Sequence, residues 1–207
     1  MQLSTWSTFY SSTPPWDVGH PQQAFVKLVE SGEMIPSRVL DIGSGPGENT
    51  IFLAETGFST IGIDFTPEAV EIARDRARDR GVDVEFIVGN VLDLSRYFGS
   101  NTFDYVIDSG LFHSIHPQDL SSLIEKIEYV LKPNGIYYML CFSDKEPPGF
   151  GPRRISKEMI RSALEPRFGV KYIRDSIFES KIHRGGARAY QYSLYNKIKK
   201  MCRDLTG

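Results

Sequence analysis

The segment Arg-Val-Leu-Asp-Ile-Gly-Ser-Gly-Pro-Gly-Glu-Asn, residues 38–49, combines residue types that suit a nucleotide-like cofactor. Glycines at positions 43, 45 and 47 let the backbone turn tightly and approach a ligand, because no Cβ stands in the way. The carboxylate of Asp41, two residues before the first glycine, suits an ammonium or hydroxyl partner better than a pyrophosphate. These residues predict a cofactor site, and the alternative is a glycine-rich turn in an unrelated α/β protein.

The spacing of the glycines separates two kinds of cofactor. Dinucleotide-binding loops follow the pattern G-x-G-x-x-G and hold a pyrophosphate at a helix N-terminus. Here the pattern is G-x-G-x-G, so the third glycine comes one residue early. A second acid, Asp64, ends the predicted strand 59–64 about 20 residues after the loop, where nucleotide-binding units contact ribose. Because a carboxylate accepts strong hydrogen bonds from both ribose hydroxyls, Asp64 is predicted to bind ribose.

Alternating strands and helices are predicted to position these residues. Apolar runs predict strands at residues 39–42, 59–64, 82–88, 103–108, 136–142, 169–179 and 188–196. Helix starts are predicted near Gln22, at Pro67 after a capping Thr66, at Ser121 and after Ser156. Such alternation is typical of an α/β sheet with helices on both faces.

Over residues 38–143 this order resembles the class I methyltransferases that use S-adenosylmethionine. Their motif I is close to Val-Leu-Asp-x-Gly-x-Gly-x-Gly, the segment from Asp108 to His113 resembles motif IV, and Leu-Lys-Pro-Asn-Gly is a frequent turn before their fifth strand. The resemblance implies a Rossmann-like α/β fold with a seven-stranded, mostly parallel sheet in the order 3-2-1-4-5-7-6, the last strand antiparallel. It implies S-adenosylmethionine as cofactor, with Asn90 in place of the commoner Asp beside adenine; the alternative for Asn90 is a plain turn residue.

A second informative segment, Tyr10 to Gln22, combines prolines with Trp16 and Asp17. It resembles the Pro-Trp-Asp-x-Gly-x-Pro segment of the thiol, thiocyanate and halide methyltransferases, within the thiopurine methyltransferase-like group. By that resemblance Trp16 and Asp17 belong to a lid over the cofactor, which Tyr10 and Gln22 help to close. Alternatively, Trp16 anchors the N-terminus to the core through its large apolar area. The predicted cofactor-binding residues are Trp16, Gln22, Asp41, Gly43, Ser44, Gly45, Asp64, Phe65, Asn90, Val91, Asp108, Ser109 and Gly110.

Methyl transfer requires mainly that the protein orient the reactants and exclude water, because the sulfonium of S-adenosylmethionine already carries an activated methyl group. His113 and His116 are candidate general bases, since imidazole titrates near neutrality, although a loop histidine is commonly structural. Arg153 is predicted to hold an anion at the pocket mouth, because guanidinium pairs with planar anions; its alternative is a solvated helix start. The predicted catalytic residues are His113, Tyr10 and Arg153.

The composition limits the partners. The chain has 207 residues and a formal net charge of -2, and no extended basic stretch calls for nucleic acid. No apolar run of membrane-spanning or signal-peptide length starts the chain, so no membrane partner and a cytoplasmic location are expected. Two cysteines form no metal or disulfide pattern. The run from Arg74 to Arg80 mixes both signs, which predicts an exposed helix face.

One methyltransferase domain, residues 1–207, is expected, with a lid at 1–20, an α/β core at 21–196 and a tail at 197–207. Three functions fit the sequence. The first is methyl transfer to a small-molecule thiol or similar soft acceptor, which the Pro-Trp-Asp segment favours. The second is transfer to an oxygen, nitrogen or carbon acceptor, and the third is cofactor binding without catalysis. The intact Asp41, glycine loop and Asp64 argue against the third. A monomer or homodimer is expected.

Overall fold

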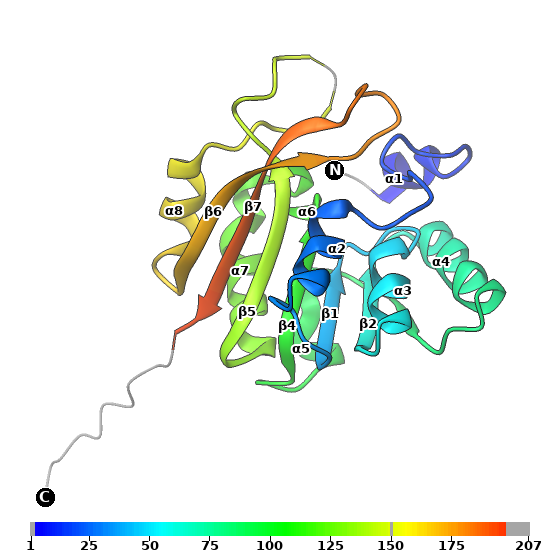
Figure 1. Ribbon diagram of the computed structural model, residues 1–207, viewed down its shortest axis with the longest axis horizontal. Coiled ribbons are helices and arrows are strands. Elements are labelled where there is room, and N and C mark those ends of the chain that lie inside the picture. The colour runs from blue at the N-terminus through cyan, green and yellow to red at the C-terminus, as the bar shows by residue number, and fades with distance from the viewer. Residues whose placement is uncertain (1–2, 150, 198–207) are drawn as a thin grey trace, which may run out of the picture.

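The computed structural model describes residues 3–149 and 151–197. Its centre is a seven-stranded sheet in the order β3-β2-β1-β4-β5-β7-β6 (Figure 1). Strands β1 to β5 pair in parallel, whereas β7 pairs antiparallel with both β5 and β6. The predicted strand order and the antiparallel last strand are therefore confirmed. The strands are β1 (Arg38–Ile42), β2 (Ser59–Asp64), β3 (Glu85–Val88), β4 (Phe103–Ser109), β5 (Leu131–Phe142), β6 (Phe168–Phe178) and β7 (Ala187–Asn196).

The helices begin largely where the capping residues predict. Pro67 opens α4 after Thr66, and the Ser156 hydroxyl accepts the amide of Met159 at the start of α8. An N-terminal helix, α1, was not predicted from the sequence. The helices are α1 (Leu3–Phe9), α2 (Gln23–Glu30), α3 (Glu48–Glu55), α4 (Pro67–Asp79), α5 (Leu94–Tyr97), α6 (Leu111–Ser114), α7 (Leu120–Val130) and α8 (Lys157–Leu164), with 3-10 turns η1 (Val91–Asp93) and η2 (Pro117–Asp119).

Two strands differ from the predicted ranges by more than one residue. Strand β3 begins at Glu85 rather than at residue 82. Strand β5 already begins at Leu131, which pairs with Phe103, and the next pair is Tyr105 with Ile136. The predicted turn at 132–135 is therefore an irregular insertion within the strand, where Asn134 adopts a φ of 63°.

Helices cover both faces of the sheet, because alternate strand residues point to opposite sides. Leu40 of β1 packs in a cluster with residues of α7 and α8, whereas its neighbour Val39 packs in a second cluster with α2 and α3. A third cluster joins α3, α4 and β3 around Phe86. Among the described residues, no helix is both long and apolar enough to cross a membrane.

The register brings the predicted cofactor residues to one edge of the sheet. Ile42, the last residue of β1, lies opposite Ile63 in β2 and Asp108 in β4. The loops after these three parallel strands therefore leave the sheet side by side, at the top of Figure 1. Helix α1 and the segment after it lie near the same end, so the N-terminal segment and the glycine loop belong to one site.

Candidate active site

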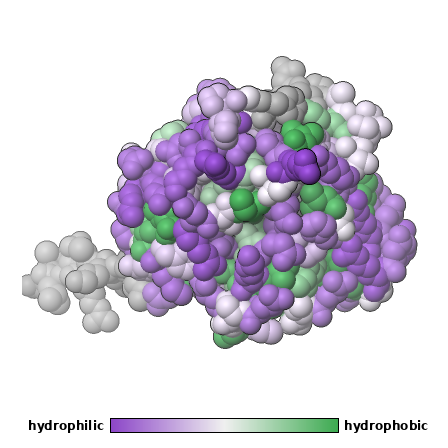
Figure 2. Space-filling model, turned by 45° about the horizontal axis from the view of Figure 1, so that its top comes forward, coloured by the Kyte–Doolittle hydropathy of each residue, from purple (hydrophilic) through white to green (hydrophobic). Residues whose placement is uncertain are grey.

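A cavity of about 860 Å³ lies where the parallel strands end. Figure 2 brings this end of the molecule forward and shows hydrophobic residues set among mostly hydrophilic ones. Most predicted site residues line the cavity, but Asp41 and Asp108 are not part of its wall. The predicted residues in the wall are Tyr10, Trp16, Gln22, Gly43, Ser44, Gly45, Asp64, Phe65, Asn90, Val91, Ser109, Gly110, His113 and Arg153.

The glycine loop forms a backbone cradle at one end of the cavity. The amides of Gly43 and Ser44 both donate to the carbonyl of Ile63, at 2.8 and 3.1 Å. Gly45 and Gly47 have φ values of 52° and 83°, which side-chain-bearing residues rarely adopt. The sequence has glycine at both positions because the chain reverses here between β1 and α3.

Asp64 lies in the cavity wall, held by two backbone amides. Its side chain lines the cavity at the end of β2, and its carboxylate accepts the amides of Gly45 and Thr66, at 3.0 and 2.8 Å. Burial raises its pKa above the usual value. The two amides orient the carboxylate between the glycine loop and α4.

Asp41 lies beneath the loop and is almost fully buried. One carboxylate oxygen accepts the Thr50 hydroxyl at 2.7 Å, whereas Oδ1 has no partner among the described residues. Burial raises the pKa of Asp41 to about 7. A buried acceptor without a partner next to a glycine cradle fits a cofactor that carries an ammonium group.

The carboxylate of Asp108 is engaged within the fold rather than in the cavity wall. Its carboxylate accepts the amides of Leu111 and Phe112 and the hydroxyl of Tyr137, with distances of 2.7, 3.1 and 2.8 Å. Burial raises its pKa to about 7. The side chain fixes the start of α6, so any cofactor contact at this position falls to the backbone.

Asn90 lines the cavity, but its side-chain oxygen accepts the amide of Leu92 at 3.0 Å and caps η1. An adenine amino group would share that oxygen. Its turn-residue role is thus visible in the structure, and its adenine role stays a prediction.

The N-terminal segment covers the glycine loop. Trp16 packs edge-on against Trp6 and Phe9, with ring centres 5.4 and 5.1 Å apart. Its indole nitrogen donates to the Tyr10 hydroxyl at 3.3 Å. That hydroxyl lies 3.4 Å from the point where a Cβ on Gly45 would stand. The residues predicted as a lid therefore lie directly over the loop.

Gln22 fastens the end of this segment. Its side-chain amide donates to the Glu179 carbonyl and accepts the Glu179 amide, at 3.0 and 2.8 Å. Both ends of the amide are thus engaged with the end of β6, although the residue also lines the cavity.

His113 lies at the other end of the cavity, between the rings of Phe142 and Phe178. Its Nδ1 accepts the backbone amide of Phe142 at 2.9 Å. An acceptor nitrogen carries no proton, so this bond assigns the proton of the neutral ring to Nε2. Burial, reinforced by the charges of Arg153 and Arg154, lowers the pKa of His113 to about 3. His113, which lines the cavity, is therefore neutral and can donate a hydrogen bond only through Nε2.

Arg153 supports the helix that carries His113. Its guanidinium donates to the carbonyls of Phe112 and Ile115, at 3.1 and 3.0 Å, and so closes the end of α6. His116 also lines the cavity, and its Nδ1 accepts the amide of Gln118 at 3.4 Å before η2.

Several wall residues were not predicted. Phe142 and Phe178 end strands β5 and β6, and Trp6 and Phe9 belong to α1. His183, in the loop between β6 and β7, stacks edge-on against Phe142 with ring centres 5.4 Å apart. The position of Phe142 at a strand end was the one signal available, since ligands bind beyond the carboxyl ends of parallel strands. Among the described residues, no group of His, Cys, Asp or Glu side chains is placed to hold a metal ion.

Comparisons with known proteins agree with this geometry. Residues 39–135 match the family described as a methyltransferase domain. The chain is 31% identical over 179 residues to 2-heptyl-1-hydroxyquinolin-4(1H)-one methyltransferase of Mycobacteroides abscessus. The aligned residues cover 85% of this chain and 76% of that relative. The chain is 26% identical over 152 residues to the probable thiol methyltransferase 2 of Arabidopsis thaliana, covering 73% and 67%. A solved structure from work on the conversion of a disulfide bond into a thioacetal group during echinomycin biosynthesis superposes with a TM-score of 0.85, at 26% identity over 96% and 94% of the two chains.

The chain therefore belongs to the class I S-adenosylmethionine-dependent methyltransferases, as the sequence resemblance implied. It is an enzyme, and S-adenosylmethionine is its cofactor. When bound, the cofactor supplies a methyl group that its sulfonium already activates. The glycine cradle, the buried Asp41 and the carboxylate of Asp64 in the cavity wall together fit such a group.

Proposed function

We propose that this methyltransferase acts on a small aromatic molecule and methylates a thiol, or a similarly acidic atom, that reacts as its anion. The aromatic rings of Phe142 and Phe178 form apolar walls at the end of the cavity away from the glycine loop. Such walls favour a flat, apolar acceptor.

The observation that carries this proposal is that the acceptor end has no free carboxylate to serve as a base. Three acidic residues line the cavity in the described part of the chain. Asp64 is bound by backbone amides, and Asp17 and Glu48 are paired with Arg76. His113 already carries its proton on Nε2, so in this arrangement it cannot take one from the substrate. An acceptor that is ionised before it binds needs no base.

The side chains then orient the reactants rather than transfer protons. We propose that the Nε2–H of His113 donates a hydrogen bond to the anionic atom or to an oxygen beside it. Arg153 keeps α6 in place, and the Tyr10 hydroxyl closes the space above Gly45. Holding two reactants in the right geometry is worth about 7–11 kcal/mol in favourable cases.

The proposed cofactor contacts follow from the same positions. Asp64 binds the ribose hydroxyls, the loop from Gly43 to Gly45 passes along the nucleoside, and Trp16 covers the methionine part. Phe65, Asn90 and Val91 surround the adenine, and Ser109 and Gly110 lie where the methyl group meets the acceptor. Asp41, buried beneath the loop and outside the cavity wall, attracts the ammonium group through its charge.

The names of two relatives support this class of acceptor. One is named for a ring-bound hydroxyl compound and the other as a probable thiol methyltransferase. A hydroxyl on a heteroaromatic ring is the second candidate acceptor, because it also ionises readily. Transfer to an amine or carbon fits less well, since such groups require a base and the cavity offers no free carboxylate among the described residues, which leaves the imidazoles of His116 and His183 as the candidates.

The test is the pH dependence of kcat/KM with a series of substituted thiophenols whose thiol pKa values differ. If the acceptor enters as its anion, the midpoint of each profile follows the pKa of the thiol used. A midpoint that stays constant across the series would instead show that a titrating group of the enzyme acts as base, and would refute the proposal. N-hydroxylated heteroaromatic compounds and anilines serve as further acceptors: the former should be methylated and the latter should not.

A further inference from the structure

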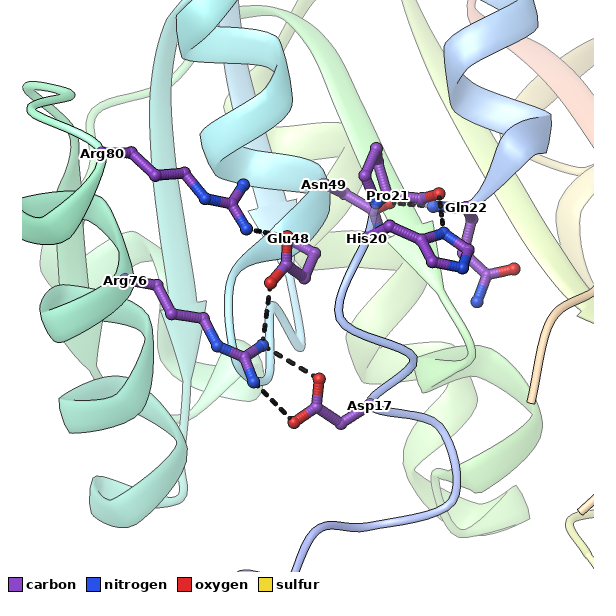
Figure 3. A network of polar contacts seen from close by, with 8 residues as sticks. All are labelled: Asp17, His20, Pro21, Gln22, Glu48, Asn49, Arg76 and Arg80. Carbon is purple, nitrogen blue, oxygen red and sulfur yellow. Dashed lines mark hydrogen bonds and ion pairs between the residues drawn. The ribbon is translucent and has the colours of Figure 1, made fainter. Parts of the chain in front are cut away.

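An ion pair from α4 holds the lid segment, residues 10–20. Asp17 is only 5% exposed, and its two carboxylate oxygens accept from the two terminal nitrogens of Arg76, at 2.9 and 2.8 Å. Figure 3 shows the two side chains facing each other across the space between the lid and α4. This forked arrangement is the strongest that an arginine and a carboxylate form.

The same arginine also reaches the glycine loop. Arg76 lies 3.0 Å from a carboxylate oxygen of Glu48, whose other oxygen pairs with Arg80 at 2.6 Å (Figure 3). Glu48 is the first residue of α3 and directly follows Gly47. Arg76 therefore joins the lid and the end of the glycine loop through one guanidinium group.

The lid has a second attachment on its acceptor side, where the Pro15 carbonyl accepts the amide of Lys181 at 2.8 Å. Trp16 lies between the two attachments, and Tyr10, six residues earlier, accepts its indole N–H and lines the cavity beside it. Losing the Arg76 contact would leave the buried carboxylate of Asp17 without its counter-charge. That carboxylate would then turn toward water and carry Trp16 with it.

We propose that Arg76 is a positioning residue for methyl transfer, which holds the lid closed over the cofactor by pairing with Asp17. Arg76 does not line the cavity and touches neither reactant, so its effect passes through Asp17 and Glu48. The inference requires methyl transfer only and is independent of the acceptor proposed above.

The two tryptophans of the chain make this testable, because Trp16 belongs to the lid segment and Trp6, in α1 directly before it, contacts Trp16. Intrinsic fluorescence therefore reports the lid. The variants are Arg76→Ala, the charge-retaining Arg76→Lys and, as matched control, Arg78→Ala. Arg78 lies on the same helix, but its side chain is 73% exposed and pairs only within α4.

With S-adenosylhomocysteine as the probe, we expect Arg76→Ala to weaken its binding by about tenfold, equivalent to about 1.4 kcal/mol. Acrylamide should quench its tryptophans more strongly, and the KM for S-adenosylmethionine should rise more than kcat falls. Arg76→Lys should recover part of the affinity, and Arg78→Ala should behave as the wild type. Wild-type affinity and quenching in Arg76→Ala, or equal losses in Arg78→Ala, would overturn the proposal. Should Arg76→Ala not fold, Asp17→Asn decides by the same criteria.

Discussion

Replacing Asp41 with asparagine should stabilise the cofactor-free protein at neutral pH while weakening cofactor binding. Burial raises the pKa of Asp41 from 3.8 to about 7, and its Oδ1 has no partner among the described residues. The folded state therefore disfavours the charged carboxylate. Because one pKa unit corresponds to about 1.4 kcal/mol, keeping Asp41 ionised in the folded protein costs up to about 4 kcal/mol. Asparagine preserves the shape and can still accept the Thr50 hydroxyl, but carries no charge.

The sign of the pH dependence follows from the raised pKa. Well below pH 3.8 Asp41 is neutral in both the folded and the unfolded chain, so its stabilising contribution is complete. As pH rises toward 7 the unfolded chain has already lost the proton that the folded chain retains, and the free energy of unfolding falls. His113 acts in the opposite direction, because its pKa is lowered and its contribution is lost on acidification. The difference between variant and wild type isolates the contribution of Asp41.

The assay is urea unfolding followed by far-UV circular dichroism between pH 4.5 and 8, without cofactor. We expect the variant to gain stability over the wild type as pH rises, by up to about 4 kcal/mol near pH 8. The exposed Asp83→Asn is the control and should change nothing. Calorimetry with S-adenosylmethionine should show weaker binding, since the proposed ammonium partner is gone. A constant stability difference across this pH range would refute the assignment of a raised pKa to Asp41.

Two further predictions concern the cofactor cradle. Asp64→Ala should weaken S-adenosylmethionine binding in calorimetry at least about tenfold, equivalent to about 1.4 kcal/mol, and unchanged affinity would contradict the ribose role. Gly47→Ala should lower the free energy of unfolding by about 2–5 kcal/mol, because left-handed backbone and overpacking both contribute. The new Cβ would stand 2.7 Å from Phe86, whereas Gly32, also left-handed, has open space around it. Urea unfolding should therefore show a clearly smaller loss for Gly32→Ala, and equal losses would count against the packing argument.

The cofactor half of the site could be predicted because its information is local. The strand, glycine turn and helix start of residues 38–49 are contiguous, and each has a residue type that its conformation requires. The location of Asp64 near the glycine loop could be predicted because the carboxyl ends of neighbouring parallel strands lie at the same edge of a sheet. The sheet order followed from the resemblance of the whole strand and helix sequence to one family.

The residues at the acceptor end of the cavity could not be predicted, because they are distant in the sequence and come together only in the folded chain. Phe142 and Phe178 come from strands that β7 separates, and His183 comes from the loop that follows β6. The proton position on His113 depends on an amide 29 residues away. The run from Arg74 to Arg80 illustrates the same limit: Arg78 is exposed as its pattern predicts, whereas Arg76 pairs with Asp17, 59 residues earlier.

Because the cofactor end and the acceptor end of the cavity are built from different residues, substitutions at the two ends should have different effects. Residues proposed to bind the cofactor also support the fold: Asn90 caps η1, and Asp64 joins two loops. Substitutions there affect folding and cofactor binding together. Phe142, Phe178 and His183 instead contribute mainly ring surfaces to the acceptor end of the cavity. Their replacement should alter which acceptor fits, whereas the glycine loop, which these residues do not contact, should keep its conformation.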